Sequence, residues 1–168
     1  MEKGDLTYRI NGCAMIVHRK LGRGFMEYIY CRALAIELRR AGIAFQREVW
    51  LPIYYDQYKI GARRIDFLIE GHITVEIKAK TELEEKDFAQ ALNTLSRLNI
   101  ETGLLINFGG KSLEHKHLFN MGYEKDKQSE DVTPEFVGEP DNDLFQLRNY
   151  MPEWVIHKMQ LDKLKKKS

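Results

Sequence analysis

The sequence predicts an α/β domain in which a mixed central sheet is flanked by helices. Apolar residues recur at helical spacing through residues 6–40, and from Val49 onward the pattern changes to the alternation that is typical of strands. A second helical pattern then precedes one continuous apolar run at 103–108, so the expected order is two helices, three strands, a helix and a strand. A strand meander followed by a helical crossover gives both antiparallel and parallel pairs.

Composition indicates one globular domain. The chain has 168 residues, of which 43% are hydrophobic and 30% charged, and its formal net charge is +1. No apolar run approaches the ~20 residues that span a bilayer, and the N-terminus lacks a signal-peptide pattern. Cys13 and Cys31 suit buried hydrophobic positions in a reducing compartment better than a disulfide framework or a metal site. We therefore expect a soluble, cytoplasmic protein without a membrane partner.

The two N-terminal helices have recognisable ends. We expect the first to begin with Asp5 as its N-cap and to end at Gly22-Arg23-Gly24. Its core positions are spaced at three or four residues: Leu6, Ile10, Ala14, Val17 and Leu21. The second helix should run from about Phe25 to Arg40, and Gly42 should close it.

Three successive strands are expected next, at Val49–Tyr55, Arg64–Ile69 and Ile73–Ala79. A helix should follow, because Thr81-Glu82-Leu83-Glu84 has the form of a capping box. Its core face holds Phe88, Ala91, Leu92, Leu95 and Leu98. The apolar run Gly103–Phe108 is typical of a strand that is buried on both faces.

The C-terminal third differs in composition from the rest. We expect a folded domain over 1–124 and a poorly ordered acidic connector over 125–143, which holds seven acids and two lysines. Residues 144–168 should form an amphipathic helix with a basic tip, although Pro152 would kink this helix or begin a new one.

Two acids are expected to lie side by side in the sheet. Alternation puts Ile65, Phe67 and Ile69 on one face of their strand and Asp66 on the other, and it separates Glu76 from its apolar neighbours in the next strand. If a three-residue hairpin loop joins the strands, the Cβ atoms of the two acids lie ~5 Å apart. Such a pair is kept when a cation bridges it or one acid stays protonated, and Mg²⁺ suits carboxylate oxygens.

Three further residues complete the candidate site. Glu27 shares a helical stripe with three core positions: Cys31, Leu34 and Leu38. A buried acid is costly unless it is paired or binds a cation. Lys78 supplies the positive charge that an attacking water or a phosphoryl transition state needs. Gln90 lies beside the apolar face of the later helix and could reach the same cleft.

A purely structural interpretation stays open for each residue taken singly. Lys78 could pair with Glu76 and Asp66 across a partly exposed sheet face. Glu27 could be a helix-terminus charge that favours the helix dipole. The combination of a helix acid, a strand Asp, Glu-x-Lys and a helix Gln, in this order of elements, favours a functional site.

The segment Gly24-Phe-Met-Glu27-Tyr-Ile-Tyr30 resembles the signature of the GxxExxY proteins, a family of the PD-(D/E)XK nuclease-like superfamily. The likeness runs from about Cys13 to Phe108. The other segments that carry it are Val17-His18-Arg-Lys-Leu-Gly, Ala35-Ile-Glu-Leu-Arg, Arg64-Ile-Asp66, Val75-Glu76-Ile-Lys78-Ala79, Ala89-Gln90 and Gly103-Leu-Leu-Ile-Asn-Phe-Gly. Two positions depart from the family: Arg23 stands where it usually has proline, and Thr94 where it usually has tyrosine.

This resemblance implies a restriction-endonuclease-like αβββαβ core with a mixed central sheet over 1–124. It also implies roles for the site residues. Asp66 and Glu76 would ligate Mg²⁺ (or Mn²⁺) with the carbonyl of Ile77, and Glu27 would act through water or as a further ligand. Lys78 would orient the attacking water, and Gln90 would support the site or the substrate.

The favoured function is a metal-dependent nuclease that hydrolyses DNA. Residues 1–64 hold twelve Lys and Arg against six acids, and 65–110 hold four against eight, which is compatible with phosphate contacts around an acidic metal site. The alternative is a non-catalytic nucleic-acid or protein interaction module that retains the fold. A third interpretation is a purely structural homo-oligomer, such as a homodimer, built on the tail helix.

Overall fold

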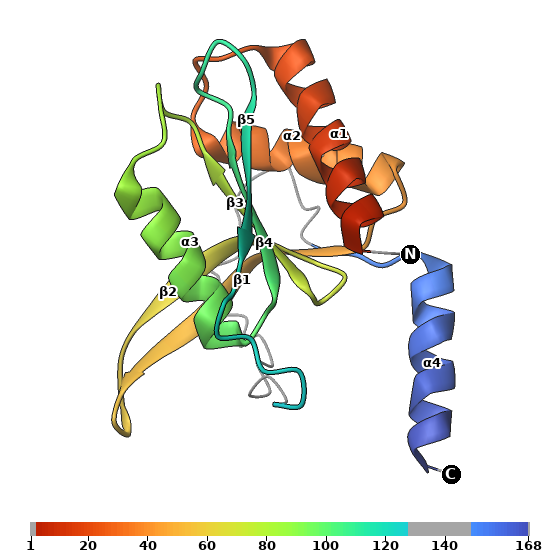
Figure 1. Cartoon of the computed structure of the whole chain (residues 1–168). Helices are drawn as coiled ribbons and strands as arrows, with labels where there is room; N and C mark the ends of the chain where they lie inside the picture. Colours follow the sequence, from red (N-terminus) through yellow and green to blue (C-terminus); the bar gives the residue numbers. More distant parts are fainter. Residues whose placement is uncertain (1–2, 128–148, 168) are drawn as a thin grey trace.

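The computed structural model describes residues 3–127 and 149–167, and the predicted connector from residue 128 onward lies outside them. Within these residues one six-stranded sheet has the order β5-β4-β3-β2-β1-β6 (Figure 1). Its strands are β1 Phe45–Tyr55, β2 Tyr58–Ile69, β3 Ile73–Lys78, β4 Thr102–Asn107, β5 Glu114–Phe119 and β6 Asn149–Tyr150. The β3–β4 pair is parallel and the other pairs are antiparallel, so the predicted mixed sheet is confirmed.

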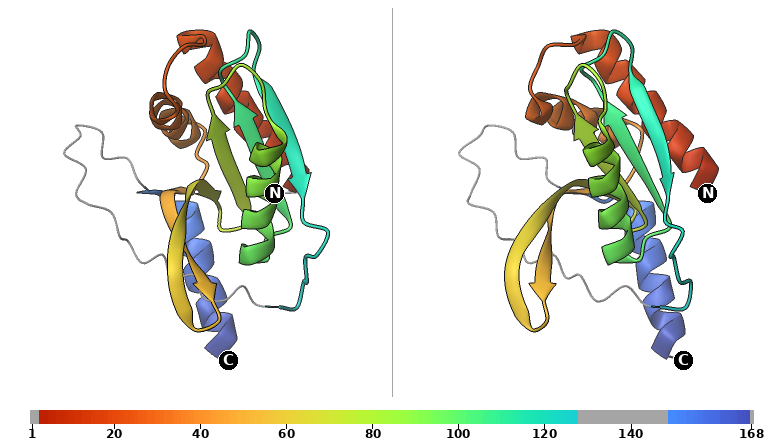
Figure 2. Two further views of the ribbon diagram at one scale, coloured as in Figure 1. Left: turned by 90° about the vertical axis from the view of Figure 1, so that its left-hand side faces the viewer. Right: turned by 60° about the vertical axis from the view of Figure 1, so that its left-hand side comes forward.

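Helices cover both faces of the sheet. They are α1 Lys3–Leu21, α2 Glu27–Arg40, α3 Glu85–Leu98 and α4 Glu153–Lys167. α1 and α2 pack on one face and α3 on the other (Figures 1 and 2), and each face has its own apolar core. This is the α/β architecture expected of a restriction-endonuclease-like fold. No helix in the described part of the chain has the length and apolar composition to cross a membrane.

The hairpin of β1 and β2 changes face at Glu48 and Asp66. Phe67 and Ile69 pack in the core under α1 and α2, whereas Ile65 packs in the core under α3. The prediction that these three side chains share one face is therefore wrong. The physical reason is a local irregularity: the β1–β2 ladder skips the pair of Glu48 and Asp66, and Glu48 has a φ of 54°. Asp66 thus occupies the point where the strand twists from one core to the other.

The C-terminal end of α2 lies where the sequence predicts it, whereas the N-terminal ends of α1 and α3 differ from the prediction. Gly42 has a φ of 69° and its N–H bonds the carbonyl of Arg39, so it closes α2 as expected. Asp5 lies in the first turn of α1 and is not its N-cap. The capping acceptor of α3 is Asp87, whose Oδ2 accepts the N–H of Glu84 at 2.8 Å, so α3 begins later than the predicted box.

Two C-terminal features differ from the expectation. β5 was not predicted, because only Leu118 of its six residues is buried and its pattern gives no strand period. α4 begins directly after Pro152, which therefore starts a helix and does not kink one. Asn149 and Tyr150 pair with β1, and the predicted helical residues 144–148 lie outside the described part.

Candidate functional site

The two strand acids lie on neighbouring strands, where the pairing of β2 with β3 ends. The last ladder pair is Phe67 with Val75, one residue before Asp66 and Glu76. Beyond it the N–H of Ile77 is bonded by a side chain, because Asp66 Oδ2 accepts it at 2.8 Å. The carboxylate of Asp66 is therefore fixed against β3 immediately beside Glu76.

The pKa of both carboxyl groups is raised above its ordinary value. Burial raises the pKa of Asp66, while the Ile77 N–H and the Arg64 guanidinium oppose that rise. Burial and then the charge of Asp66 raise the pKa of Glu76 to about 8, against the opposing charge of Lys78. In the described residues no group donates a hydrogen bond to the Glu76 carboxylate. A pKa of about 8 favours the protonated form of Glu76 at neutral pH.

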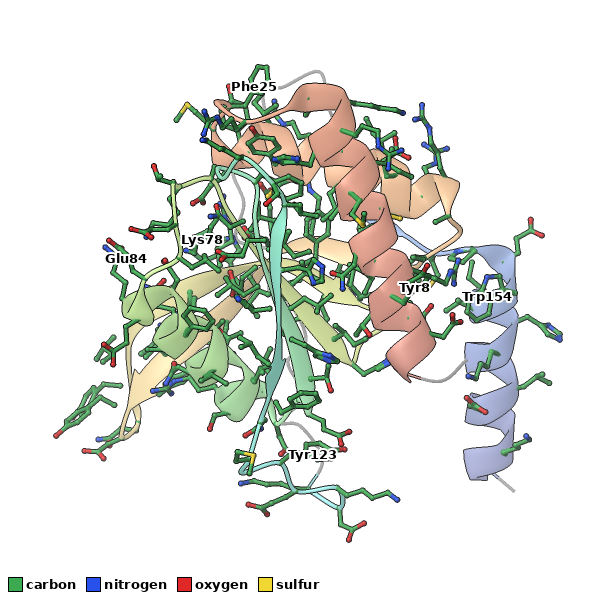
Figure 3. The ribbon with its side chains drawn as sticks, turned by 45° about the horizontal axis from the view of Figure 1, so that its top comes forward. Tyr8, Phe25, Lys78, Glu84, Tyr123 and Trp154 are labelled. Carbon is green, nitrogen blue, oxygen red and sulfur yellow. The ribbon has the colours of Figure 1, made fainter. Side chains whose placement is uncertain are left out.

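Lys78 pairs with α3 and not with the strand acids. Its Nζ lies 3.9 Å from Oδ1 of Asp87, a side chain that is 3% exposed. Asp87 also binds Lys80 Nζ, at 2.9 Å, so the longer contact to Lys78 is the weaker one. Lys78 is the last residue of β3 (Figure 3), and its charge opposes the rise in the pKa of both Asp66 and Glu76, so its ammonium lies within electrostatic reach of the acids.

Glu27 is the first residue of α2, and its side chain is exposed. The prediction that it lies on the buried stripe is wrong. The buried stripe begins one turn later, at Tyr30, and continues through Leu34 and Leu38. The charge of Glu27 nevertheless raises the pKa of Asp66 and of Cys31, so Glu27 lies within electrostatic reach of the site.

Tyr30 holds the loop that leads to Glu27. Its hydroxyl donates to the carbonyl of Gly22 at 2.7 Å and accepts the N–H of Phe25 at 3.2 Å. Its ring is fully buried and stacks on Phe108 with 4.6 Å between centroids. The Gly-x-x-Glu-x-x-Tyr spacing therefore places a charged residue at the helix start and its anchor one turn further on.

We expect Tyr30→Phe to destabilise the protein by about 1–3 kcal/mol, because it leaves the Gly22 carbonyl and the Phe25 N–H without their partner. Chemical denaturation would measure the change. Tyr8→Phe is the matched control, since Tyr8 is 78% exposed and its hydroxyl should contribute little. Equal midpoints for Tyr30→Phe and wild type would show that the loop is held by other contacts.

Gln90 lies on α3 with its side chain exposed. Its backbone carbonyl accepts hydrogen bonds from Arg63 Nη1 at 2.9 Å and from the Thr94 hydroxyl at 3.1 Å. Arg63 also donates to Thr94 Oγ1 at 3.2 Å. These contacts tie the backbone of Gln90 to β2 through Arg63. Thr94 joins β2 to α3, which gives a structural role to the position where a tyrosine was expected.

Arg64 and Glu48 are site neighbours that the sequence did not single out. Arg64 lies between two acids, with Nη2 3.8 Å from Asp66 Oδ1 and Nη1 3.7 Å from Glu48 Oε1. The adjacent arginines before Asp66 were the only available signal for Arg64. Glu48 could not be found from its pattern, because its left-handed backbone conformation is unusual within a strand.

The donor set suits a hard cation held by two carboxylates. Asp66 and Glu76 offer oxygen atoms in a site where their negative charges are only partly compensated. Across residues 3–127 and 149–167 no three His, Cys, Asp or Glu side chains converge as a ready metal cluster. Glu27 is exposed at the start of α2 and does not form such a cluster with the two strand acids in the described residues. A cation at this place would keep several waters, as Mg²⁺ commonly does.

Comparisons with known proteins agree with this geometry. Residues 4–118 match the family model described as the PD-(D/E)XK nuclease superfamily, and the matched segment includes Asp66, Glu76 and Lys78. A search of curated proteins and a search of solved structures found no significant match. The matched segment covers more than half of the chain and contains α1, except its first residue, and every element from α2 through β4. The chain therefore belongs to the PD-(D/E)XK nuclease superfamily.

Proposed function

We propose that this protein is a metal-dependent nuclease of the GxxExxY family that hydrolyses DNA phosphodiester bonds. One observation carries the proposal: Asp66, fixed by the Ile77 N–H at 2.8 Å, lies beside the half-buried Glu76, and burial and then the charge of Asp66 raise the pKa of Glu76. Keeping two such acids together is unfavourable for the fold alone. A divalent cation would replace the proton on Glu76 and neutralise the pair.

The residues that would hold Mg²⁺ or Mn²⁺ are Asp66 and Glu76, with the carbonyl of Ile77 beside them. Glu27, exposed at the start of α2, would act through a metal-bound water. The ion would polarise a phosphate oxygen and lower the pKa of a bound water. Asp66 is already oriented for this role, because the Ile77 N–H fixes Oδ2, and Oδ1, which lies 3.8 Å from Arg64 Nη2, would be the ligating oxygen.

Lys78 would position the attacking water and offset negative charge in the transition state. Asp87 restrains its ammonium at 3.9 Å without a close contact, which keeps the side chain near the acids. Gln90 would support the substrate from α3. These roles follow from the two-carboxylate and lysine arrangement that the sequence predicts.

A cleavage panel tests the proposal. Single-stranded, double-stranded and branched DNA, and RNA, would be incubated with wild type and Mg²⁺, Mn²⁺ or EDTA. We expect cleavage of DNA that depends on the metal and is lost in Glu76→Ala. Glu153→Ala is the matched control, because Glu153 is an exposed glutamate on α4. This variant should cleave DNA as wild type does. Metal-independent cleavage, or equal rates in Glu76→Ala and wild type, would contradict the proposal.

A non-catalytic nucleic-acid module is the second candidate. The ion pair of Lys78 with Asp87 favours it, since a lysine bound to α3 can be structural. If the protein is such a module, wild type should bind DNA in every assay and should fail to cut it, whichever metal is added. Binding and turnover must therefore be measured on the same preparation.

A further inference from the structure

The β1–β2 hairpin extends beyond the sheet as a two-stranded ribbon (Figure 2). β6 pairs with β1 only at Phe45 and Gln46, and β3 pairs with β2 only from Phe67 onward. Every residue from Tyr54 to Ala62 is exposed. Both faces of the tip therefore meet solvent, which is unusual for a strand pair, because a hairpin is normally stabilised by packing one face.

The tip carries large side chains that a solvated turn does not need. Tyr55 and Tyr58 face each other across the two strands and are 69% and 64% exposed. Tyr54 and Ile60 are 53% and 65% exposed. Tyr55 and Tyr58 share one face of the ribbon and Tyr54 lies on the other, so both faces expose large side chains, as interaction sites often do. Tyrosine suits recognition because its ring is apolar and its hydroxyl stays hydrated.

The charge along β2 indicates an anionic partner. Asp56 is the only acid among residues 49–65, where Lys59, Arg63 and Arg64 supply positive charge. Arg64 is the last of these, and its guanidinium lies 3.8 Å from Asp66. Arg63 is hydrogen-bonded to α3 and Arg64 lies between Glu48 and Asp66, whereas Lys59 is exposed at the tip. These three cations lead from the tip to the candidate site, so one polyanion could contact both.

A second copy of the chain fits this ribbon poorly. Pro52 lacks an N–H and interrupts the free edge of β1, and a register shift follows at Ile53 and Tyr54. The free edge of β2 carries the basic side chains, which would repel the same edge of another copy. The same positive charge attracts phosphate groups, so nucleic acid is favoured over self-pairing.

We propose that the β1–β2 hairpin is a nucleic-acid-binding arm of the site. This inference rests on the proposed function and adds the surface that holds the substrate. The nine residues from Tyr58 to Asp66 span roughly 25 Å, or about seven base pairs of duplex. A two-stranded ribbon fits the major groove of duplex DNA, and exposed tyrosines stack on unpaired bases. Duplex and single-stranded probes separate these two modes.

The test measures affinity separately from turnover. Labelled single-stranded and duplex oligonucleotides would be titrated with the full chain in EDTA over a series of salt concentrations. We expect the double variant Tyr55→Ala and Tyr58→Ala to bind at least about fivefold more weakly. Lys59→Ala should lower the slope of log affinity against log salt by about one. Thermal midpoints should stay unchanged, because these side chains are exposed.

Tyr8→Ala is the matched control, since Tyr8 is an exposed tyrosine on α1, on the other face of the sheet from α3 (Figure 3). Wild-type affinity in the double variant, or equal losses in Tyr8→Ala, would overturn the inference. Loss of self-association in the double variant with unchanged affinity for nucleic acid would also overturn it, because the arm would then bind a second copy of the chain. A wild type that binds no probe would overturn it as well. Hairpin-dependent binding without cleavage would keep the arm and overturn the nuclease. Cleavage without hairpin dependence would do the reverse.

Discussion

Replacing Lys78 by alanine should lower the rate of metal-dependent DNA cleavage by at least about a hundredfold while leaving DNA affinity almost unchanged. The expected loss falls on kcat, because a cation that positions water acts mainly on the transition state. The structural cost should be small. Asp87, the ion-pair partner of Lys78, keeps its closer bond to Lys80 and its bond to the Glu84 N–H.

Lys80→Ala is the control for this variant. Lys80 binds the same Asp87 and also Glu84, but Lys78 is the lysine whose charge opposes the raised pKa of Glu76. We expect Lys80→Ala to lower the thermal midpoint and to retain turnover. If Lys78→Ala lost stability and kept its cleavage rate, Lys78 would be a structural partner of α3. Steady-state kinetics and thermal unfolding of both variants decide between the two roles.

The sheet was predictable where burial is strong. The run Gly103–Phe108 corresponds to β4 at Thr102–Asn107, because a parallel strand covered on both faces needs apolar side chains throughout. β5 lies at the edge of the sheet and buries only Leu118, so hydrophobic patterning carries almost no signal for it. An edge strand such as β5 is held by backbone hydrogen bonds to the neighbouring strand, and a single sequence does not reveal this pairing.

The site was predictable in its strand residues and less so in its surroundings. Asp66 and Glu76 follow from strand alternation and a short turn. The twist at Glu48 interrupts the alternation between Ile65 and Phe67, so these two side chains pack in different cores. The sequence does not reveal that a glutamate will adopt a positive φ. Glu27 was assigned to the buried stripe because periodicity does not tell where the first turn of a helix leaves the sheet.

Glu76→Gln should make the metal-free protein more stable than wild type at alkaline pH. The pKa of Glu76 is raised by burial and by Asp66 to about 8, so the folded state holds a proton that the unfolded chain releases near its ordinary pKa of 4.5. The folded state therefore binds more protons between these values, and the free energy of unfolding falls as pH rises from 4.5 to about 8. Glutamine removes this loss, with an upper limit of about 5 kcal/mol at about 1.4 kcal/mol per pKa unit.

Thermal unfolding in EDTA from acid to alkaline pH would measure the difference. The two proteins should coincide in acid, where Glu76 is protonated in both states, and diverge as pH rises toward 8. Mn²⁺ should then raise the midpoint of wild type and leave Glu76→Gln unchanged, because the cation needs the ionised carboxylate. Glu153→Gln, on exposed α4, should follow the wild-type curve throughout. Parallel curves for Glu76→Gln and wild type at every pH would mean that Glu76 is ionised and solvated, and the paired-carboxylate site would lose its basis.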